Sequence, residues 1–97
     1  MPELESSTQH RIAKALRARG ALVLVTTPGP GIPIGTPDIV GVLPGGRAFA
    51  IEVKRPGREG GLSAKQRWEC WEWASRGALV GVGVSSDLEA VALLFGE

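Results

Sequence analysis

The chain has 97 residues and a mass of 10.2 kDa, so we expect one domain over residues 1–97. Hydrophobic residues make up 43% and charged residues 22%, which is typical of a folded globular protein and excludes a disordered chain or a coiled coil. The net charge is only +1, but residues 47–67 carry six basic and two acidic side chains, whereas residues 68–97 carry one basic and five acidic ones. This segregation favours a basic face that binds a polyanion, with an ordinary solvated surface as the alternative.

No segment of the sequence is typical of a membrane or secreted protein. The longest apolar runs are far shorter than the roughly 20 residues that cross a bilayer, so we expect no membrane span. The first residues lack the basic start and apolar stretch of a secretory signal, which makes a cytoplasmic location the default expectation. Cys70 is the only cysteine and His10 the only histidine. A disulfide, a zinc–thiolate cluster and a site with two histidines are therefore excluded, and any metal must be bound by oxygen ligands.

The chain is predicted to begin with a helix and a strand. A helix is predicted over residues 5–19, because Ile12 and Leu16 share one face and a glycine follows the last turn. Glu5 falls on the same face as these two residues. Residues 21–26 are a short β-rich run, which predicts a buried strand.

Residues 27–37 contain four prolines and three glycines, and therefore predict a loop. Glycines close together also occur in loops that bind nucleotide phosphates. This segment, however, lacks the Gly-Lys-Ser/Thr ending of such loops, and no helix follows it directly. We therefore predict no nucleotide cofactor.

The middle of the chain predicts a tight β-hairpin. Residues 38–43 and 47–54 are two β-rich runs, and they are separated by the turn sequence Pro44-Gly45-Gly46. Side chains alternate between the two faces of a strand, so Glu52 and Lys54 are expected on the same face.

The last part of the chain predicts a helix, a strand and a second helix. Ser63 is expected to cap a helix that ends near residue 76, and residues 78–84 form a further buried strand. Ser86 is expected to cap a last helix that runs to about residue 95. The complete order is αβββαβα, which predicts an α/β fold with a mixed α+β sheet.

Two acidic residues and a lysine of the hairpin form the candidate site. Asp38 follows a proline at the start of the first strand, and the hairpin folds Glu52 back toward it. Two adjacent carboxylates supply hard oxygen ligands for Mg²⁺, which also binds phosphate readily. Lys54 can help position or deprotonate a water and stabilise charge on a phosphate. The pattern favours phosphodiester hydrolysis, with a surface salt bridge as the ordinary alternative for an acid-x-lysine triplet.

Four stretches of the sequence also carry a family resemblance. They are residues 5–20, Gly35-Thr36-Pro37-Asp38-Ile39, Ala50-Ile51-Glu52-Val53-Lys54-Arg55-Pro56-Gly57 and Gly61-Leu62-Ser63-Ala64-Lys65-Gln66. Together they resemble the virus-type replication-repair nuclease (VRR-NUC) family of the PD-(D/E)XK superfamily, over nearly the whole chain. The resemblance implies a DNA endonuclease with a restriction-endonuclease-like αβββαβ core, dependent on Mg²⁺, with Mn²⁺ as a substitute.

The resemblance also implies five site residues: Glu5, Asp38, Glu52, Lys54 and Gln66. The metal would be bound by the three carboxylates, and Lys54 and Gln66 would complete the site. Two of these assignments have alternatives. Glu3 competes with Glu5 for the helix carboxylate, and Gln66 is alternatively an ordinary polar residue on the flank of its helix.

Stand-alone viral members of this family are similar to archaeal Holliday junction resolvases, which cut four-way junctions as homodimers. The resemblance therefore implies a homodimeric resolvase of branched DNA, and it leaves a phage origin open. The alternatives are a restriction-like or nicking nuclease on duplex or flap DNA, and a catalytically inactive DNA-binding module. Contacts to the DNA backbone are expected from basic side chains, namely His10, Lys14, Arg17, Arg55, Arg58 and Lys65.

The three tryptophans lie within six residues of one predicted helix. The helical spacing places Trp71 on the core face with Cys70 and Ala74, and leaves Trp68 and Trp73 on the flanks. Either two of the three are in the core and one is half-exposed, or one anchors a subunit interface. The interface predicted on the second interpretation combines a flanking tryptophan with the apolar end of the last helix, at Leu93, Leu94 and Phe95.

Overall fold

The computed structural model describes residues 5–54 and 61–97, with only the backbone of Glu5. Its helices and strands confirm the predicted order αβββαβα and the mixed α/β fold. The elements are α1 Glu5–Ala18, β1 Leu22–Val25, β2 Ile39–Val42, β3 Ala48–Val53, α2 Ala64–Ser75, β4 Leu79–Val84 and α3 Asp87–Phe95. Over the described part of the chain, no helix is both long enough and apolar enough to span a membrane.

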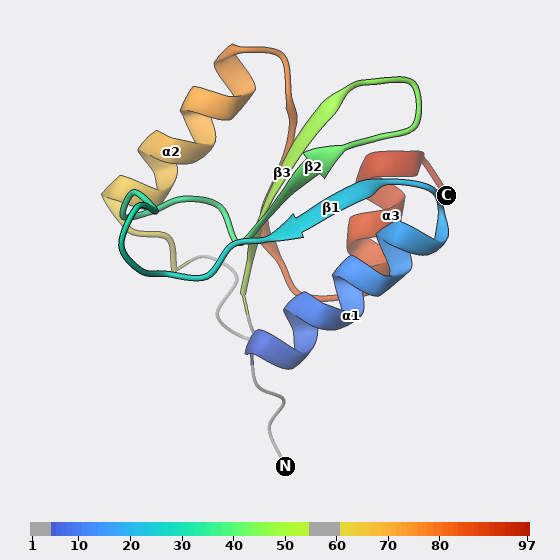
Figure 1. Ribbon diagram of the computed structural model, residues 1–97, viewed down its shortest axis with the longest axis horizontal. Helices are drawn as coiled ribbons and strands as arrows, with labels where there is room; N and C mark the ends of the chain where they lie inside the picture. Colours follow the sequence, from blue (N-terminus) through green and yellow to red (C-terminus); the bar gives the residue numbers. More distant parts are fainter. Residues whose placement is uncertain (1–4, 55–60) are drawn as a thin grey trace.

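The four strands form one mixed sheet in the order β1-β2-β3-β4 (Figure 1). Strands β1, β2 and β3 pair antiparallel with their neighbours, and a tight turn closes the β2–β3 hairpin as predicted. Gly45 and Gly46 in this turn both have positive φ, a conformation that glycine adopts without strain. Strand β4 runs parallel to β3, because α2 first carries the chain back along the sheet.

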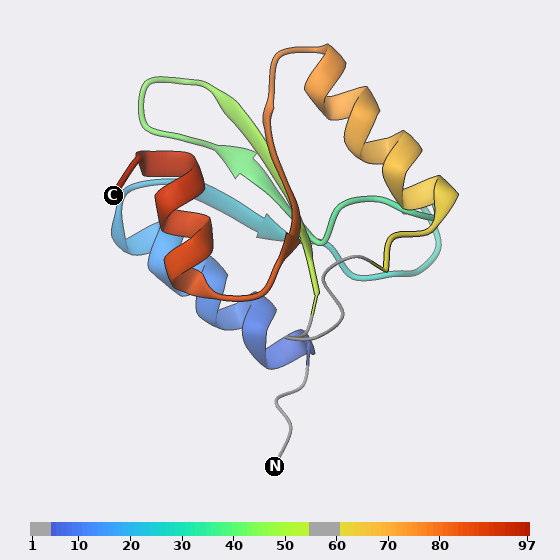
Figure 2. The same ribbon diagram turned by 180° about the vertical axis from the view of Figure 1, so that it is seen from behind.

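The helices lie on both faces of the sheet (Figures 1 and 2). Helices α1 and α3 pack against each other on one face, and α2 lies on the other. The alternation along β3 directs Phe49, Ile51 and Val53 into the core beneath α1 and α3. The residues between them, including Glu52, face α2. The polar site predicted from the sequence therefore lies on the α2 side of the sheet.

Helix α1 buries the face that its periodicity predicts. Ile12 and Leu16 are fully buried, whereas His10 and Lys14 on the opposite side are exposed. Arg17 near the end of the helix donates a hydrogen bond to a backbone carbonyl of β1 at 3.1 Å. This bond ties α1 to the edge of the sheet.

Two serines begin the last two helices, as predicted. Ser63 Oγ accepts a hydrogen bond from the backbone N–H of Gln66, and Ser86 Oγ accepts one from the backbone N–H of Glu89. Each hydroxyl satisfies a donor that has no partner within its own helix.

The rotation of α2 differs in part from the prediction. We expected Trp71 on the core face with Cys70 and Ala74; these three line one hollow over β4, but Trp71 is 56% exposed and Ala74 is exposed as well. The helix also contacts the sheet through Gln66, Cys70 and Trp73, whose spacings of four and three residues define one stripe. The hydrogen bond from Gln66 to Glu52 of the sheet fixes the rotation of α2. This rotation therefore cannot be predicted from the periodicity of the helix alone.

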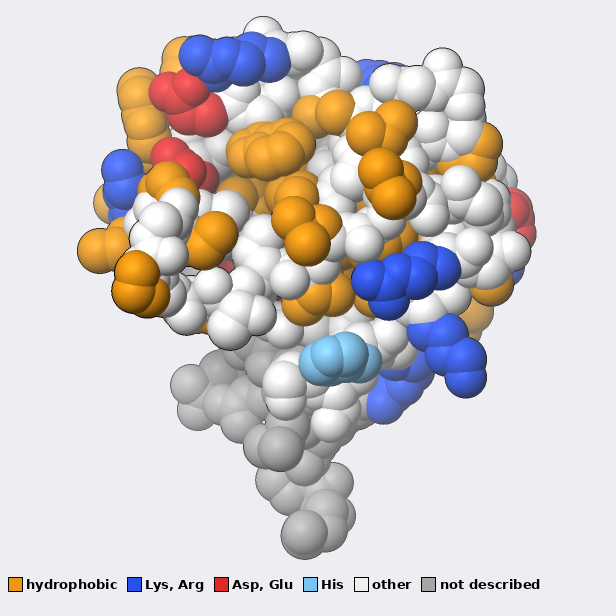
Figure 3. All heavy atoms as spheres, viewed as in Figure 1, with side chains coloured by type: hydrophobic (Ala, Val, Ile, Leu, Met, Phe, Trp, Pro, Cys, Tyr) orange, Lys and Arg blue, Asp and Glu red, His pale blue; other side chains and the backbone are white. Residues whose placement is uncertain are grey.

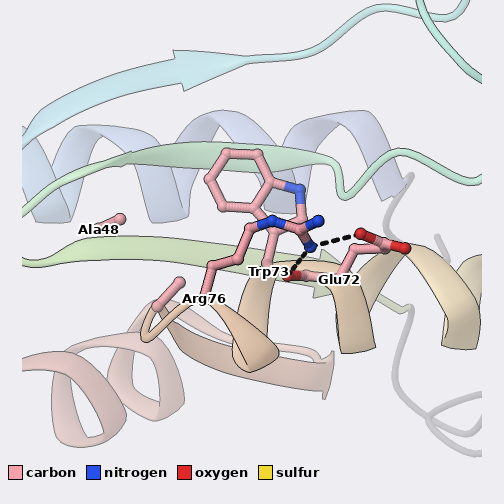
Figure 4. A pocket seen from close by; sticks show the side chains of 5 residues that line it. Ala48, Glu72, Trp73 and Arg76 are labelled. Atoms are coloured by element: carbon pink, nitrogen blue, oxygen red, sulfur yellow. Dashed lines mark hydrogen bonds and ion pairs between the residues drawn. The ribbon is translucent and has the colours of Figure 1, made fainter.

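Trp73 lies half-buried near the C-terminal end of this stripe (Figure 4). It lines a shallow hollow together with Ala48 of β3, and the Arg76–Glu72 ion pair forms another part of the wall. Trp73 therefore seats α2 on the sheet, and the exposed tryptophans of this helix are the other two.

The dimer interface expected from the sequence combines residues from the two faces of the sheet. Helix α3 lies on the opposite face from α2 (Figure 2), and both helices contact the edge strand β4. Leu94 is buried in the core and Phe95 packs against it, while Leu93 stays partly exposed. Of the three apolar residues at the end of α3, only Leu93 is therefore exposed enough to contribute to an interface, and the interface itself stays a prediction.

Close packing at Gly41 provides a test of the sheet. A Cβ at this position would lie 1.9 Å from the carbonyl oxygen of Leu22 and 2.9 Å from the ring of Phe49. We expect Gly41→Ala to lower the free energy of unfolding by about 1–3 kcal/mol, the usual cost of overpacking, as measured by urea unfolding. The control is Gly29→Ala, because a Cβ at Gly29 would meet no atom within 4 Å. Equal losses in the two variants would contradict the described packing.

Candidate active site

The end of the β2–β3 hairpin brings two carboxylates onto neighbouring strands. Ile39 of β2 pairs with Ile51 of β3, and the same antiparallel register places Asp38 opposite Glu52 at the next position. Residues directly opposite in an antiparallel pair have Cα atoms about 4.5–5.5 Å apart and side chains on the same face. The hairpin therefore sets these two acidic side chains next to each other.

Asp38 is fixed from both sides by backbone contacts. Its Oδ2 accepts a hydrogen bond from the backbone N–H of Val53 at 2.8 Å. On the β1 side, the backbone N–H of Thr26 donates to the carbonyl of Asp38 at 2.8 Å, and the Thr26 hydroxyl donates to the carbonyl of Pro37 at 2.7 Å. The Pro-Asp step is thus held between β1 and β3, and Asp38 remains half-buried.

Glu52 is almost completely buried, with 1% of its surface exposed. A buried carboxylate needs polar partners, because its desolvation costs on the order of several kcal/mol. Its Oε1 accepts a hydrogen bond from Nε2 of Gln66 at 2.9 Å. The Gln66 amide is fixed in turn, since its Oε1 accepts from the backbone N–H of Ser63 at 2.9 Å in a capping box. The start of α2 is therefore coupled to the position of Glu52.

Cys70 lies one helical turn after Gln66, on the same stripe of α2. Burial raises the pKa of the Cys70 thiol to about 11, and the negative charges of Glu52 and Asp38 add to this effect. The thiol therefore stays protonated and uncharged at neutral pH. That both carboxylates act on this one sulfur agrees with their close placement beneath α2.

Lys54 follows directly after β3. Its backbone N–H donates to the carbonyl of Val84 at 2.9 Å, so the pairing with β4 continues to this residue. Strand β4 carries a bulge at Gly83, whose φ is 72°, while β3 stays regular. The alternation along β3 consequently places Lys54 on the same face as Glu52, where it is half-exposed.

The basic residues predicted to contact DNA are distributed over two helices. His10 and Lys14 are exposed on α1, and Figure 3 shows basic side chains and a histidine gathered over this helix. Arg17 is engaged with β1 through its guanidinium group. Lys65 lies exposed at the start of α2, where it passes against Gly35 of the loop between β1 and β2. Outside the described residues lie Arg55, Arg58 and the side chain of Glu5, whose roles stay predictions.

Three residues that support the site were not predicted for it. Ser63 was expected only as a helix cap, although the Ser-x-x-Gln pattern of a capping box is visible in the sequence. Thr26 fixes the Pro-Asp step, and nothing in its sequence context indicates this contact. Gly35 has a φ of 86° and passes against Lys65, where a Cβ would lie 2.9 Å from backbone atoms. A glycine is therefore required where the loop touches α2.

The oxygen donors of the site suit a hard divalent cation. Asp38 and Glu52 offer adjacent carboxylates, and Mg²⁺ is commonly bound by one or two carboxylates, with water and substrate phosphate completing its octahedron. Among the side chains of residues 6–54 and 61–97, no group of three or more His, Cys, Asp or Glu residues is placed to hold a metal ion. A site of two carboxylates fits Mg²⁺ or Mn²⁺ better than it fits zinc, which prefers nitrogen and sulfur ligands.

Comparison with known proteins agrees with this fold. A solved structure described as a VRR-NUC domain superposes on the chain with a TM-score of 0.72 and 28% sequence identity, and the match covers 93% of this chain and 92% of that one. No family model matches the sequence, and no curated protein matches it significantly. The structural match extends over nearly the whole of both chains and therefore includes the hairpin and α2. The chain thus has the fold of a VRR-NUC domain, which is a nuclease fold of the PD-(D/E)XK type.

Proposed function

We propose that this protein is a metal-dependent endonuclease that hydrolyses phosphodiester bonds in branched DNA, with the four-way junction as its substrate. The similarity of the chain to a VRR-NUC domain supports a nuclease activity. The observation that carries the proposal is the pair of carboxylates, with Asp38 opposite Glu52 and Glu52 buried in contact with Gln66. A carboxylate held in this way presents its oxygens in a fixed position, which suits a ligand of Mg²⁺.

Each side chain of the proposed site has a distinct task. Asp38 and Glu52 would hold Mg²⁺, or Mn²⁺ in its place, and Glu5 is the proposed additional carboxylate. When bound, the cation neutralises charge on the phosphate and thereby favours attack by water. Lys54 would position the attacking water and stabilise the negative charge that develops on the phosphate oxygens. Gln66 would keep the Glu52 carboxylate in one orientation.

DNA shape, rather than base sequence, is the proposed basis of substrate choice. Recognition of a base sequence requires side chains that enter a groove of the DNA. The described helices and strands instead pack their side chains into the protein core. Exposed basic residues such as Lys14 and Lys65 are suited to contacts with the DNA backbone, which carry no sequence information and weaken steeply with salt. A DNA substrate also supports the predicted cytoplasmic location.

Two other functions are compatible with the fold. One is a restriction-like or nicking nuclease on duplex or flap DNA, and the other is a DNA-binding module without activity. The second would have no use for a buried carboxylate beside a half-buried one, since an unneeded buried charge destabilises a small core. The carboxylate pair therefore favours an enzyme.

Cleavage of a labelled four-way junction in Mg²⁺ tests the function. We expect wild type to cut the junction, and Asp38→Asn and Glu52→Gln to cut at least about 100-fold more slowly while still binding it, because the charge at the reacting phosphate is lost. A linear duplex of the same base composition is the matched substrate. Faster cutting of the duplex would favour the restriction-like alternative. An Asp38→Asn protein that behaves like wild type would contradict the enzyme.

The Gln66–Glu52 hydrogen bond gives a second prediction. Gln66→Ala removes both the capping box and the bond to Glu52, and we expect a 10–100-fold loss of Mg²⁺ affinity, measured as a higher Mg²⁺ concentration for half-maximal cleavage. Ser63→Ala is the control, because it removes the cap hydroxyl at a similar cost of about 1 kcal/mol in stability and leaves the amide of Gln66 in place. Equal Mg²⁺ requirements in the two variants would show that Gln66 acts only as a helix cap.

A homodimer is proposed because paired cuts across a junction require two active sites related by a two-fold axis. On α2, Trp68 and Trp71 are both exposed, with ring centroids 5.1 Å apart, and exposed tryptophans are typical of interfaces. We expect a species of about 20 kDa, twice the chain mass of 10.2 kDa, in sedimentation equilibrium. Replacing both tryptophans by alanine should yield monomers that no longer make paired cuts. A 10.2 kDa wild-type species that still makes paired cuts would refute the dimer.

A further inference from the structure

The loop between β1 and β2 surrounds a hollow beside Asp38. The hollow has a volume of about 320 Å³, at the lower end of the range for small-ligand sites. Asp38 forms part of its wall, together with Ile32, Pro33 and Ile34. A side chain of the proposed catalytic pair therefore lies at the border of an apolar cavity that the proposed chemistry does not use.

The rim of this hollow is apolar and uncharged. Ile34 is 82% exposed, Ile32 is also exposed, and residues 27–37 contain no charged side chain. Single exposed apolar residues are common on protein surfaces, but here two isoleucines and two prolines line the same hollow. Such a surface suits an uncharged, apolar group and not the phosphates of a DNA backbone.

The loop is held in place by contacts at several points along its length. The Thr36 hydroxyl donates to the carbonyl of Pro33 at 2.6 Å, and the backbone N–H of Ile32 donates to the carbonyl of Gly29 at 3.1 Å. Close contact between Gly35 and α2 fixes the second half of the loop against the helix. These contacts therefore hold the loop in a conformation that leaves Ile34 exposed.

We propose that this hollow binds a nucleobase that has left the helical stack, with Ile34 as the apolar wedge that keeps the base out. This inference rests on the proposed function and deepens it, because a phosphate at Asp38 brings the base of the adjacent nucleotide within reach of the hollow. Isoleucine and proline are among the side chains that proteins insert between bases. A continuous duplex offers no such base, whereas a branch point holds bases that unstack easily. The preferred substrate is thus DNA with an unstacked nucleotide at the cut.

Fluorescence of 2-aminopurine tests base binding without cleavage, because this base becomes brighter when it leaves the stack. The probe is a four-way junction with 2-aminopurine placed in turn at each nucleotide of the branch point, mixed with protein in Ca²⁺. We expect wild type to raise the fluorescence at one position or a symmetric pair, and Ile34→Ala to abolish most of the rise. The matched control is Leu88→Ala on α3, where the side chain is 77% exposed, and it should behave like wild type. No rise with wild type, or equal rises with both variants, would overturn the proposal.

Cleavage rates separate this inference from the proposed function. We expect Ile34→Ala to cut the junction about tenfold more slowly, the size of effect that loss of one base contact produces, and an unpaired nucleotide at the cut to restore most of the rate. A rise in fluorescence that depends on Ile34, in a protein that cuts no DNA, would support base binding and refute the nuclease. Normal cutting of the junction by Ile34→Ala would overturn the wedge and leave the nuclease standing.

Discussion

The hydrogen bond between the Gln66 amide and the Glu52 carboxylate is the interaction on which the site depends. A carboxylate in the interior needs a partner, and the nature of the partner decides what the carboxylate can do. The Gln66 amide is neutral, so this bond orients the carboxylate without cancelling any of its charge. The choice of glutamine is therefore consistent with both a stable core and a metal ligand.

The same bond determines how α2 packs. This helix has one fully buried side chain, Cys70, so apolar burial alone defines its rotation only weakly. Gln66 at one end and the half-buried Trp73 at the other fix the helix at two points along a single stripe. With the rotation set in this way, Trp68 and Trp71 are turned to the surface. The polar contact of the site thus also decides which aromatic residues are available for association.

Local sequence patterns were sufficient for most of the fold. The Pro44-Gly45-Gly46 turn and the alternation of the strands predicted the hairpin, and with it the approach of Asp38 and Glu52, because both depend on neighbours in sequence. The rotation of α2 could not be predicted, since it depends on a bond between helix and sheet. The composition of residues 27–37 predicted a loop but not the hollow beside it, which requires the contact of Gly35 with α2.

The connection between β3 and β4 has a consequence for how the site is assembled. The antiparallel hairpin joins Asp38 and Glu52 through a short turn, so this part of the site is made by contacts that are local along the chain. Gln66 is added only when the crossover through α2 docks and β4 pairs with β3, which are non-local contacts of higher entropic cost. A partially folded chain can therefore contain the Asp38–Glu52 pair without Gln66 beside it. All three side chains come together only in the native state.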